Sequence, residues 1–197
     1  MSADAAAHGH VTNTGMSNEK LAMWTFLGSE CLLFGALIST YFLYRHGENY
    51  EGALPKDLYD IPFTSVSSFV LLMSSLTMVL ALSAIQRGDG RRLRVWLLAT
   101  AFLGASFIAG QVYEFTSFIR EGMTIKTNPA SSAFYTLTGF HGVHVTLGIV
   151  MLLSLWNLSL RGRITKERSE VVEIAGLYWH FVDVVWIVIF TVIYLIP

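Results

Sequence analysis

Five long apolar segments alternate with short polar stretches along this chain of 197 residues. The segments cover approximately residues 21–44, 65–85, 93–119, 131–160 and 171–196. Each is long enough to cross the hydrocarbon core of a bilayer, about 30 Å thick, as an α-helix. Only 14% of the residues are charged, against about a quarter in an average soluble domain. The sequence therefore predicts an all-α integral membrane bundle of five transmembrane helices.

The first 19 residues are small and polar and precede the first apolar segment. They lack the basic start and short apolar core of a signal peptide, so we expect a flexible N-terminal tail at residues 1–19 and a five-helix transmembrane domain at residues 20–197. The single cysteine, Cys31, excludes an internal disulfide. With a net charge of −1 the chain has no basic surface for nucleic acid.

The basic residues indicate how the chain is oriented in the membrane. Nine of the thirteen lie before the first segment or in the connections between the second and third and the fourth and fifth segments. These nine are Lys20, Arg87, Arg91, Arg92, Arg94, Arg161, Arg163, Lys166 and Arg168. Because basic loops stay in the cytoplasm, we expect a cytoplasmic N-terminus and a C-terminus outside.

Small residues spaced four apart predict where helices pack closely in lipid. The third segment offers Ser106 and Gly110, the fourth offers Gly142 between Thr138 and Thr146, and the first offers Gly35 and Ser39.

Six ionisable side chains lie at membrane depth. They are Glu30, Glu114, His141, His144, His180 and Asp183. Because an unpaired charge in a bilayer is costly, we expect these side chains to face the bundle interior or a partner subunit. His141 and His144, like His180 and Asp183, are three residues apart and share a helix face. We expect Glu114 and these two pairs to approach one another in a single polar cluster.

Three interpretations of these residues remain open from the residues alone. Histidines on two helices could ligate a haem, whereas the Glu-x-x-His pattern of di-iron bundles is missing from the sequence. Intramembrane carboxylates could mark a proton or ion pathway, although no chain of acidic residues links the two sides. Alternatively, paired polar groups hold helix to helix or subunit to subunit, with hydroxyls such as Thr138 and Thr146 completing the hydrogen bonds. The last interpretation is favoured.

Several segments carry a family resemblance. "YWHFVDVVWIVIFTVIYLIP" resembles the last helix of subunit III of the haem–copper terminal oxidases, and "SAFYTLTGFHGVHVTLGIV" resembles the helix before it. "FLGASFIAGQVYEFTSFIREGMTI" and "WTFLGSECLLFGALISTYF" are similar to earlier helices of that family. The likeness covers residues 23–197 and is to the shorter, five-helix bacterial form. The two extra helices of the longer form, which build one wall of a lipid cleft there, have no counterpart here.

The resemblance implies a cofactor-free accessory subunit of a complex that reduces oxygen to water and pumps protons. It implies no catalytic, cofactor-binding or metal-binding residue in this chain, with haem and copper held by partner subunits I and II. The chain would stabilise subunit I, enclose bound phospholipid in a cleft that aids oxygen access, and lie in a bacterial plasma membrane as a multi-pass protein. Membership of a respiratory supercomplex is compatible with this role.

The resemblance also implies roles for individual residues. Glu30 matches the family's buried, carbodiimide-reactive acidic residue. The other polar positions match structural, lipid-contacting or subunit-interface residues; they are Glu114, His141, His144, His180 and Asp183.

Only the residues of two short motifs indicate the electron donor. "GFHG" and "YWHFVDVVW" are closer to cytochrome c oxidases than to quinol oxidases, in which "GTHG" and "FWHFLDVVW" are more frequent. The alternative is subunit III of a quinol oxidase. More remote alternatives are a standalone membrane transporter and a haem-binding membrane anchor.

Overall fold

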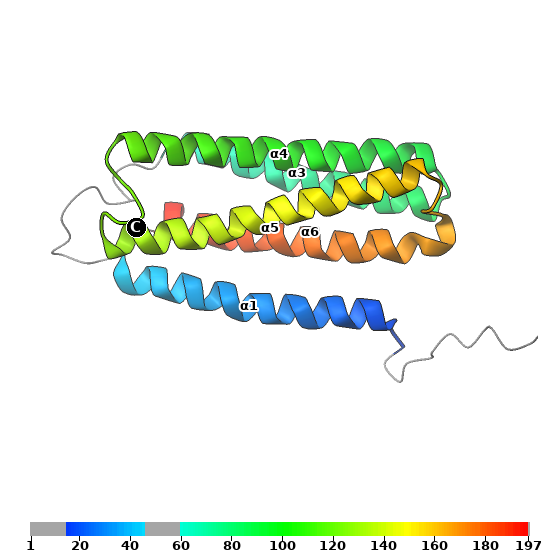
Figure 1. The fold of residues 1–197 in the computed structure, drawn as a ribbon, viewed down its shortest axis with the longest axis horizontal. Coiled ribbons are helices and arrows are strands. Elements are labelled where there is room, and N and C mark those ends of the chain that lie inside the picture. Colours follow the sequence, from blue (N-terminus) through cyan, green and yellow to red (C-terminus); the bar gives the residue numbers. More distant parts are fainter. Residues whose placement is uncertain (1–14, 46–59, 197) are drawn as a thin grey trace, which may run out of the picture.

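The computed structural model describes residues 15–45 and 60–196, and this part of the chain is helical without strands (Figure 1). Five helices are long and apolar enough to cross a membrane, which confirms the predicted five-helix architecture. They are α1 (Asn18–Tyr44), α3 (Ile61–Gln86), α4 (Gly90–Arg120), α5 (Pro129–Leu160) and α6 (Ser169–Phe190). A 3-10 turn at Lys166–Arg168 precedes α6, and a π-helical segment at Thr191–Leu195 continues it. Most of the expected N-terminal tail lies outside the described residues.

Four helices begin earlier than the apolar pattern predicts, because each starts at a polar cap. The side chains of Ser17, Asp60, Asp89 and Asn128 accept hydrogen bonds from backbone N–H groups three residues on. Such caps satisfy donors that have no partner in the first helical turn. The predicted boundaries follow the apolar stretches, and the polar turn at the start of each helix is not part of such a stretch. The predicted start of the second segment, at residue 65, therefore falls within α3, which begins at Ile61.

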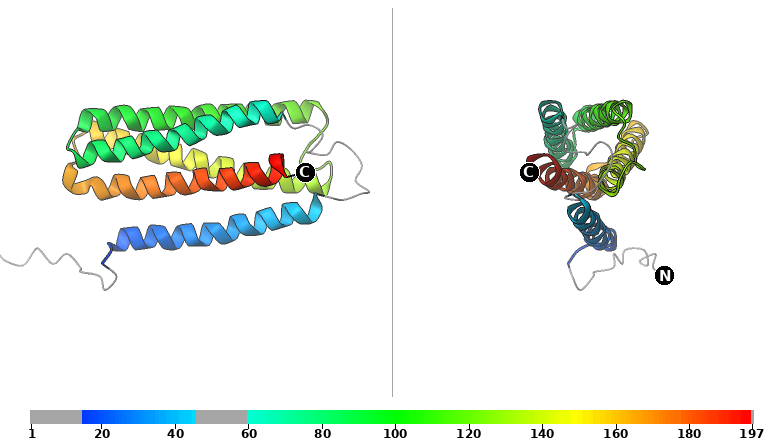
Figure 2. Two further views of the ribbon diagram at one scale, coloured as in Figure 1. Left: turned by 180° about the vertical axis from the view of Figure 1, so that it is seen from behind. Right: turned by 90° about the vertical axis from the view of Figure 1, so that its left-hand side faces the viewer.

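Helices α3, α4, α5 and α6 surround a common core, while α1 lies outside this group (Figure 2). These four helices form a ring, in which α3 contacts α4 and α6, and α5 contacts the same two helices. The first helix touches the ring along α5 and α6. Most of α1 therefore faces away from the rest of the chain.

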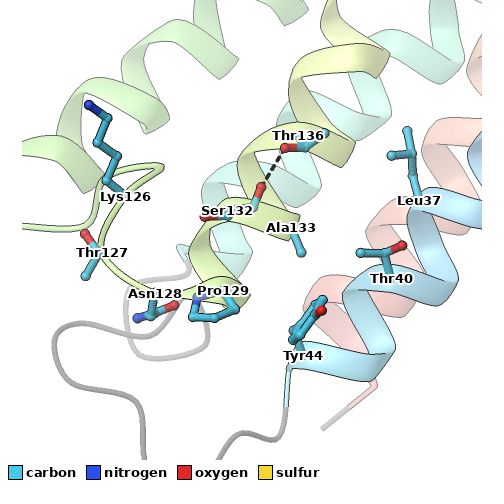
Figure 3. A pocket seen from close by; sticks show the side chains of 10 residues that line it. All are labelled: Leu37, Thr40, Tyr44, Lys126, Thr127, Asn128, Pro129, Ser132, Ala133 and Thr136. Atoms are coloured by element: carbon cyan, nitrogen blue, oxygen red, sulfur yellow. Dashed lines mark hydrogen bonds between the residues drawn. The ribbon is translucent and has the colours of Figure 1, made fainter.

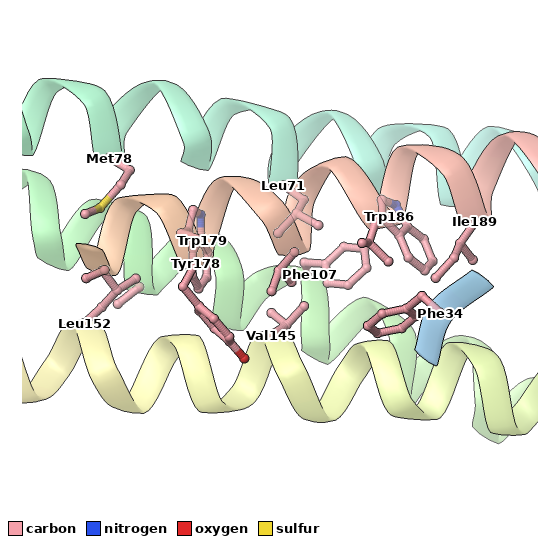
Figure 4. Close-up of a cluster of buried hydrophobic side chains, with 14 of the residues drawn as sticks. Phe34, Leu71, Met78, Phe107, Val145, Leu152, Tyr178, Trp179, Trp186 and Ile189 are labelled. Carbon is pink, nitrogen blue, oxygen red and sulfur yellow. The ribbon is translucent and has the colours of Figure 1, made fainter. Parts of the chain in front are cut away.

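The indole ring of Trp179 lies among the buried side chains between the four helices (Figure 4). Trp179 of α6 is 1% exposed and donates its Nε1–H to Ser74 Oγ of α3 at 2.9 Å. The ring lies against Gly104 of α4 and Gly148 of α5, where an added Cβ would come within 2.5 and 2.8 Å of indole carbons. Trp179 thus contacts all three other helices of the ring.

Only some of the small residues identified in the sequence lie where two helices pack closely. Gly142 leaves room for the Gln111 side chain of α4, and Gly110 packs against Ser67 of α3. Gly35 has no atom near its Cβ position, and Ser39 is exposed with its hydroxyl bonded to its own helix. The expectation of close packing at Gly35 and Ser39 is wrong within this chain, because that side of α1 faces away from the ring.

Polar contacts fasten α1 at both of its ends. At one end Lys20 Nζ pairs with Glu173 of α6 at 2.5 Å, and Ser17 donates a hydrogen bond to Glu170. At the other end Arg45 donates to the carbonyl oxygens of Val192 and Ile196, at 3.4 and 2.7 Å. These contacts hold a helix that has little buried apolar surface of its own.

The fit around Trp179 predicts a test of the core. We expect Gly148→Ala to lower the free energy of unfolding by about 1–3 kcal/mol, because the new methyl group overlaps a rigid ring. Gly139→Ala on the same helix is the control, since nothing lies within 4 Å of its Cβ position. Helix loss in a detergent titration, followed by circular dichroism, measures both; equal midpoints would contradict the packing described.

Candidate functional site

The predicted polar residues of α6 meet a hydroxyl group of α3. Ser75 donates a hydrogen bond to Asp183 Oδ2, and its Oγ lies 3.2 Å from His180 Nδ1. The serine hydroxyl can both donate and accept a hydrogen bond. Ser75 therefore joins His180 and Asp183 across the α3–α6 boundary.

Two tryptophans extend this contact along the same boundary. Trp179 bonds to Ser74, and Trp186 Nε1 donates to Ser68 Oγ at 2.8 Å. Each indole is buried, and each N–H finds a hydroxyl acceptor on α3. The polar groups of α6 thus pair with a row of serines.

Glu114 of α4 is buried at a junction of three segments. Its Oε1 accepts hydrogen bonds from Thr64 Oγ1 of α3 at 2.9 Å and from the Tyr194 hydroxyl at 3.0 Å. Tyr194 lies in the π-helical segment after α6. The carboxyl group therefore joins α3 and α4 to the C-terminal segment of the chain.

Glu30 of α1 lies against His144 of α5, with Oε2 and Nε2 3.2 Å apart. His144 Nδ1 lies 2.7 Å from the Phe140 carbonyl, which can only accept, so Nδ1 carries a proton. A hydrogen bond between Glu30 Oε2 and His144 Nε2 then requires one further proton, which is bound either to the carboxylate or to Nε2. Either arrangement is neutral overall, which lowers the cost of placing the pair inside lipid.

His141 is fully buried between aromatic rings. Its ring stacks on Trp186 of α6 with centroids 4.8 Å apart and meets Phe107 of α4 edge-on at 5.8 Å. Neither ring nitrogen has a hydrogen-bond partner. The imidazole acts here as an aromatic packing element.

The expected single polar cluster is not formed, and that prediction is wrong. Glu114, the Glu30–His144 pair and the Ser75–His180–Asp183 group each have separate partners. Among residues 15–45 and 60–196, no three His, Cys, Asp or Glu side chains are grouped so as to hold a metal ion. The polar residues are distributed around the ring because their helices present them in different directions.

Several partners were not identified from the sequence. Thr138 and Thr146 were expected to complete the hydrogen bonds, but both bond to carbonyl groups of their own helix. The hydroxyl partners are instead Thr64, Ser68, Ser74 and Ser75 of α3. Ser68 and Ser75 are seven residues apart and share a helix face, a signal that could have been recognised.

A groove of about 590 Å³ separates the last turns of α1 from the start of α5 (Figure 3). Leu37, Thr40 and Tyr44 line one side. The other side contains Lys126, Thr127, Asn128, Pro129, Ser132, Ala133 and Thr136. The groove combines apolar side chains with hydroxyl groups, and Lys126 lies at its edge (Figure 3).

Comparison with known proteins places this helical bundle in a family. Residues 1–196 match the family described as cytochrome c oxidase subunit III. The chain belongs to this family. It is therefore subunit III of a haem–copper oxidase, and it forms a complex with other oxidase subunits. The five spanning helices and the bacterial relatives identify it as a multi-pass protein of a bacterial plasma membrane.

The relatives include both oxidase classes. A Staphylococcus saprophyticus protein described as "Probable quinol oxidase subunit 3" is 36% identical over all of this chain and 97% of its own length. "Cytochrome c oxidase subunit 3" of Bacillus sp. strain PS3 is 38% identical, over 90% of this chain and 86% of the relative. "Quinol oxidase subunit 3" of Bacillus subtilis strain 168 is 39% identical, over 89% and 85%.

The serine contacts of this subunit III predict a second test. We expect Ser75→Ala to destabilise the bundle by about 1–3 kcal/mol, because it leaves Asp183 and His180 without their shared partner. Ser65→Ala on the same helix is the control, since Ser65 is exposed and bonds to the Ile61 carbonyl. If detergent titration gives the same midpoint for both variants, the α3–α6 contact does not contribute to stability.

Proposed function

We propose that this chain is the cofactor-free accessory subunit of its oxidase, stabilising subunit I while haem and copper remain in subunits I and II. The observation that carries the proposal is the use made of the intramembrane polar residues. Glu114, the Glu30–His144 pair and the His180–Asp183 pair each join one helix to another. Side chains engaged in this way support packing and not electron transfer.

The geometry of the three intramembrane histidines does not fit axial ligation of a haem. His141 is enclosed by Phe107 and Trp186, and both nitrogens of His144 have partners in the chain. Among the histidines of the described helices, His180 alone presents a nitrogen without a partner toward the outside of the bundle, and one histidine does not make a bis-histidine site. We therefore assign no catalytic, cofactor or metal role to these residues. We treat the five intramembrane polar residues other than Glu30 as structural, lipid-contacting or interface residues; they are Glu114, His141, His144, His180 and Asp183.

We infer that the N-terminus is cytoplasmic and the C-terminus outside. The α3–α4 and α5–α6 connections, together with the helix ends next to them, carry eight of the thirteen basic residues. Basic loops favour the cytoplasmic side. The groove between α1 and α5 then lies at the outer membrane boundary.

For the electron donor we propose cytochrome c, on the wording of "GFHG" and "YWHFVDVVW". Quinol is the second candidate, because two of the three relatives described above are named as quinol oxidase subunits. Oxidation of reduced cytochrome c or of a quinol analogue by the purified complex, in the presence of oxygen, discriminates between them.

We propose that the groove between α1 and α5 holds a phospholipid whose chains supply an apolar route for oxygen toward subunit I. Lys126 and the neighbouring hydroxyls suit a phosphate group, and Leu37 and Ala133 suit an acyl chain. Glu30 lies on the same helix as Leu37, in the position of the carbodiimide-reactive acid of the family, and we assign it that reactivity.

The accessory role predicts the outcome of a purification. We expect an affinity-tagged form of this chain to bring down a haem- and copper-bearing partner. We expect His141→Leu to leave the haem content per complex unchanged, because His141 only packs against rings. The height of the Soret band per mole of subunit I measures this; loss of the band, with the subunits still present, would overturn the proposal.

The lipid site predicts a selective loss of phospholipid. We expect Lys126→Gln to reduce the lipid retained by the complex in mild detergent, because it removes the ammonium group of the groove. Lys166→Gln, at the opposite end of the bundle, is the control. Native mass spectrometry counts the bound lipids, and equal retention in the two variants would contradict the assignment.

A further inference from the structure

His180 is the one intramembrane histidine that is partly exposed on the outside of the bundle. Its Nδ1 pairs with Ser75 across the α3–α6 boundary, and Nε2 has no hydrogen-bond partner within the described part of the chain. Helices α3 and α6 lie side by side on the face seen from behind (Figure 2). The imidazole therefore presents one nitrogen outward near the middle of α6.

The surroundings of His180 on this face are apolar. Leu72 and Val79 flank Ser75 on α3, and they are 41% and 51% exposed. Val184 and Ile187 follow His180 at helical spacing on α6, and they are 57% and 42% exposed. We call these four side chains, together with Ser75 and His180, the α3–α6 face. It contains one outward polar atom within an otherwise apolar surface.

The nature of that atom restricts what can cover it. In either tautomer of the imidazole, Nε2 is a polar atom that requires a hydrogen-bond partner. Acyl chains neither donate nor accept a hydrogen bond, and water is absent from the bilayer core. A polar group left unpaired in such surroundings is unfavourable. A second protein segment with a hydroxyl or amide group at this depth would satisfy it.

A contrasting face shows what lipid alone can cover. On the outer side of α5, Phe140, Val143, Leu147 and Val150 are exposed at helical spacing. All four are apolar, and they require no hydrogen-bond partner. The α3–α6 face thus presents a nitrogen without a partner in the described part of the chain, whereas these four side chains of α5 present no polar atom.

We propose that the α3–α6 face is the docking surface for a transmembrane helix of the haem-bearing subunit, which forms a hydrogen bond with His180 Nε2. The proposal rests on the accessory function given above, since it names the face that this subunit uses. Behind His180, Asp183 is buried and accepts from Ser75. The imidazole is therefore held in place by two helices before the partner arrives.

Photo-crosslinking in the intact complex locates the partner. A benzoylphenylalanine is placed at Leu72 or Val184 on the α3–α6 face, and at Val143 or Leu147 on the α5 face as matched exposed controls. We expect crosslinks to the haem-bearing subunit from the first pair and products with lipid from the second. Crosslinks to that subunit from the α5 face alone, or crosslinks between two copies of this chain from the α3–α6 face, would overturn the proposal.

Substitution of His180 tests the hydrogen bond itself. We expect His180→Phe, which retains a ring without an acceptor, to weaken retention of this subunit on the complex roughly threefold to thirtyfold, the range for one hydrogen bond between membrane helices. His180→Gln keeps an acceptor oxygen and should recover part of the loss. Equal retention of both variants and the unchanged protein would contradict a bond to the partner.

The two proposals fail in distinguishable ways. If no haem-bearing subunit is recovered with the unchanged protein, the accessory function itself is wrong. If that subunit is recovered but crosslinks through the α5 face, the function stands and the docking surface is wrong.

Discussion

The arrangement of this bundle depends on a close fit that lipid cannot replace. Apolar side chains gain little by leaving hydrocarbon for a helix interface, so membrane helices associate through close packing and hydrogen bonds. Trp179 supplies both, since its ring lies against Gly104 and Gly148 while its N–H bonds to Ser74. With four helices fixed around this ring, Glu114 and Asp183 come within reach of hydroxyl groups on α3. The polar contacts follow from the packing, and they then stabilise it.

The first helix, α1, is attached to the bundle by separated contacts and not by close packing around a central side chain. It has no counterpart of Trp179. Its buried apolar side chains are Leu27, Phe34 and Tyr41, and polar groups at its two ends, with the Glu30–His144 pair between them, complete its contacts to the ring. Such separated attachments leave open space along the helix, and the groove near Lys126 lies in one of these intervals. A helix attached at points can border a lipid-filled space, whereas a closely packed helix cannot. The location of the proposed lipid site is thus a consequence of how α1 is attached.

The sequence predicts the helices well, because a long apolar run has only one stable backbone conformation in lipid. It also predicts that the buried carboxylates and histidines have a packing role, since an unpaired charge is too costly. It does not predict their partners. Serine and threonine are frequent in the first four segments and often bond to their own helix, as Thr138 does. The spacing of Ser68 and Ser75 indicates a shared helix face, but it does not identify Trp186 or Asp183 as their partners. Similarly, Gly104 and Gly148 resemble Gly35 in sequence, and only the position of Trp179 separates them.

His141 and His180 show how one residue type serves two purposes in this membrane protein. His141 faces inward, and its contacts with Trp186 and Phe107 offset part of the unfavourable burial of its two unpaired nitrogens. His180 faces outward, where one nitrogen is already committed to Ser75 and the other has no partner among the described residues. An inward imidazole can be accommodated by the chain's own aromatic residues. An outward imidazole surrounded by apolar side chains requires a neighbour, because acyl chains supply no hydrogen-bond partner. The direction in which each histidine points therefore decides whether it contributes to the fold of this subunit or to its association with another.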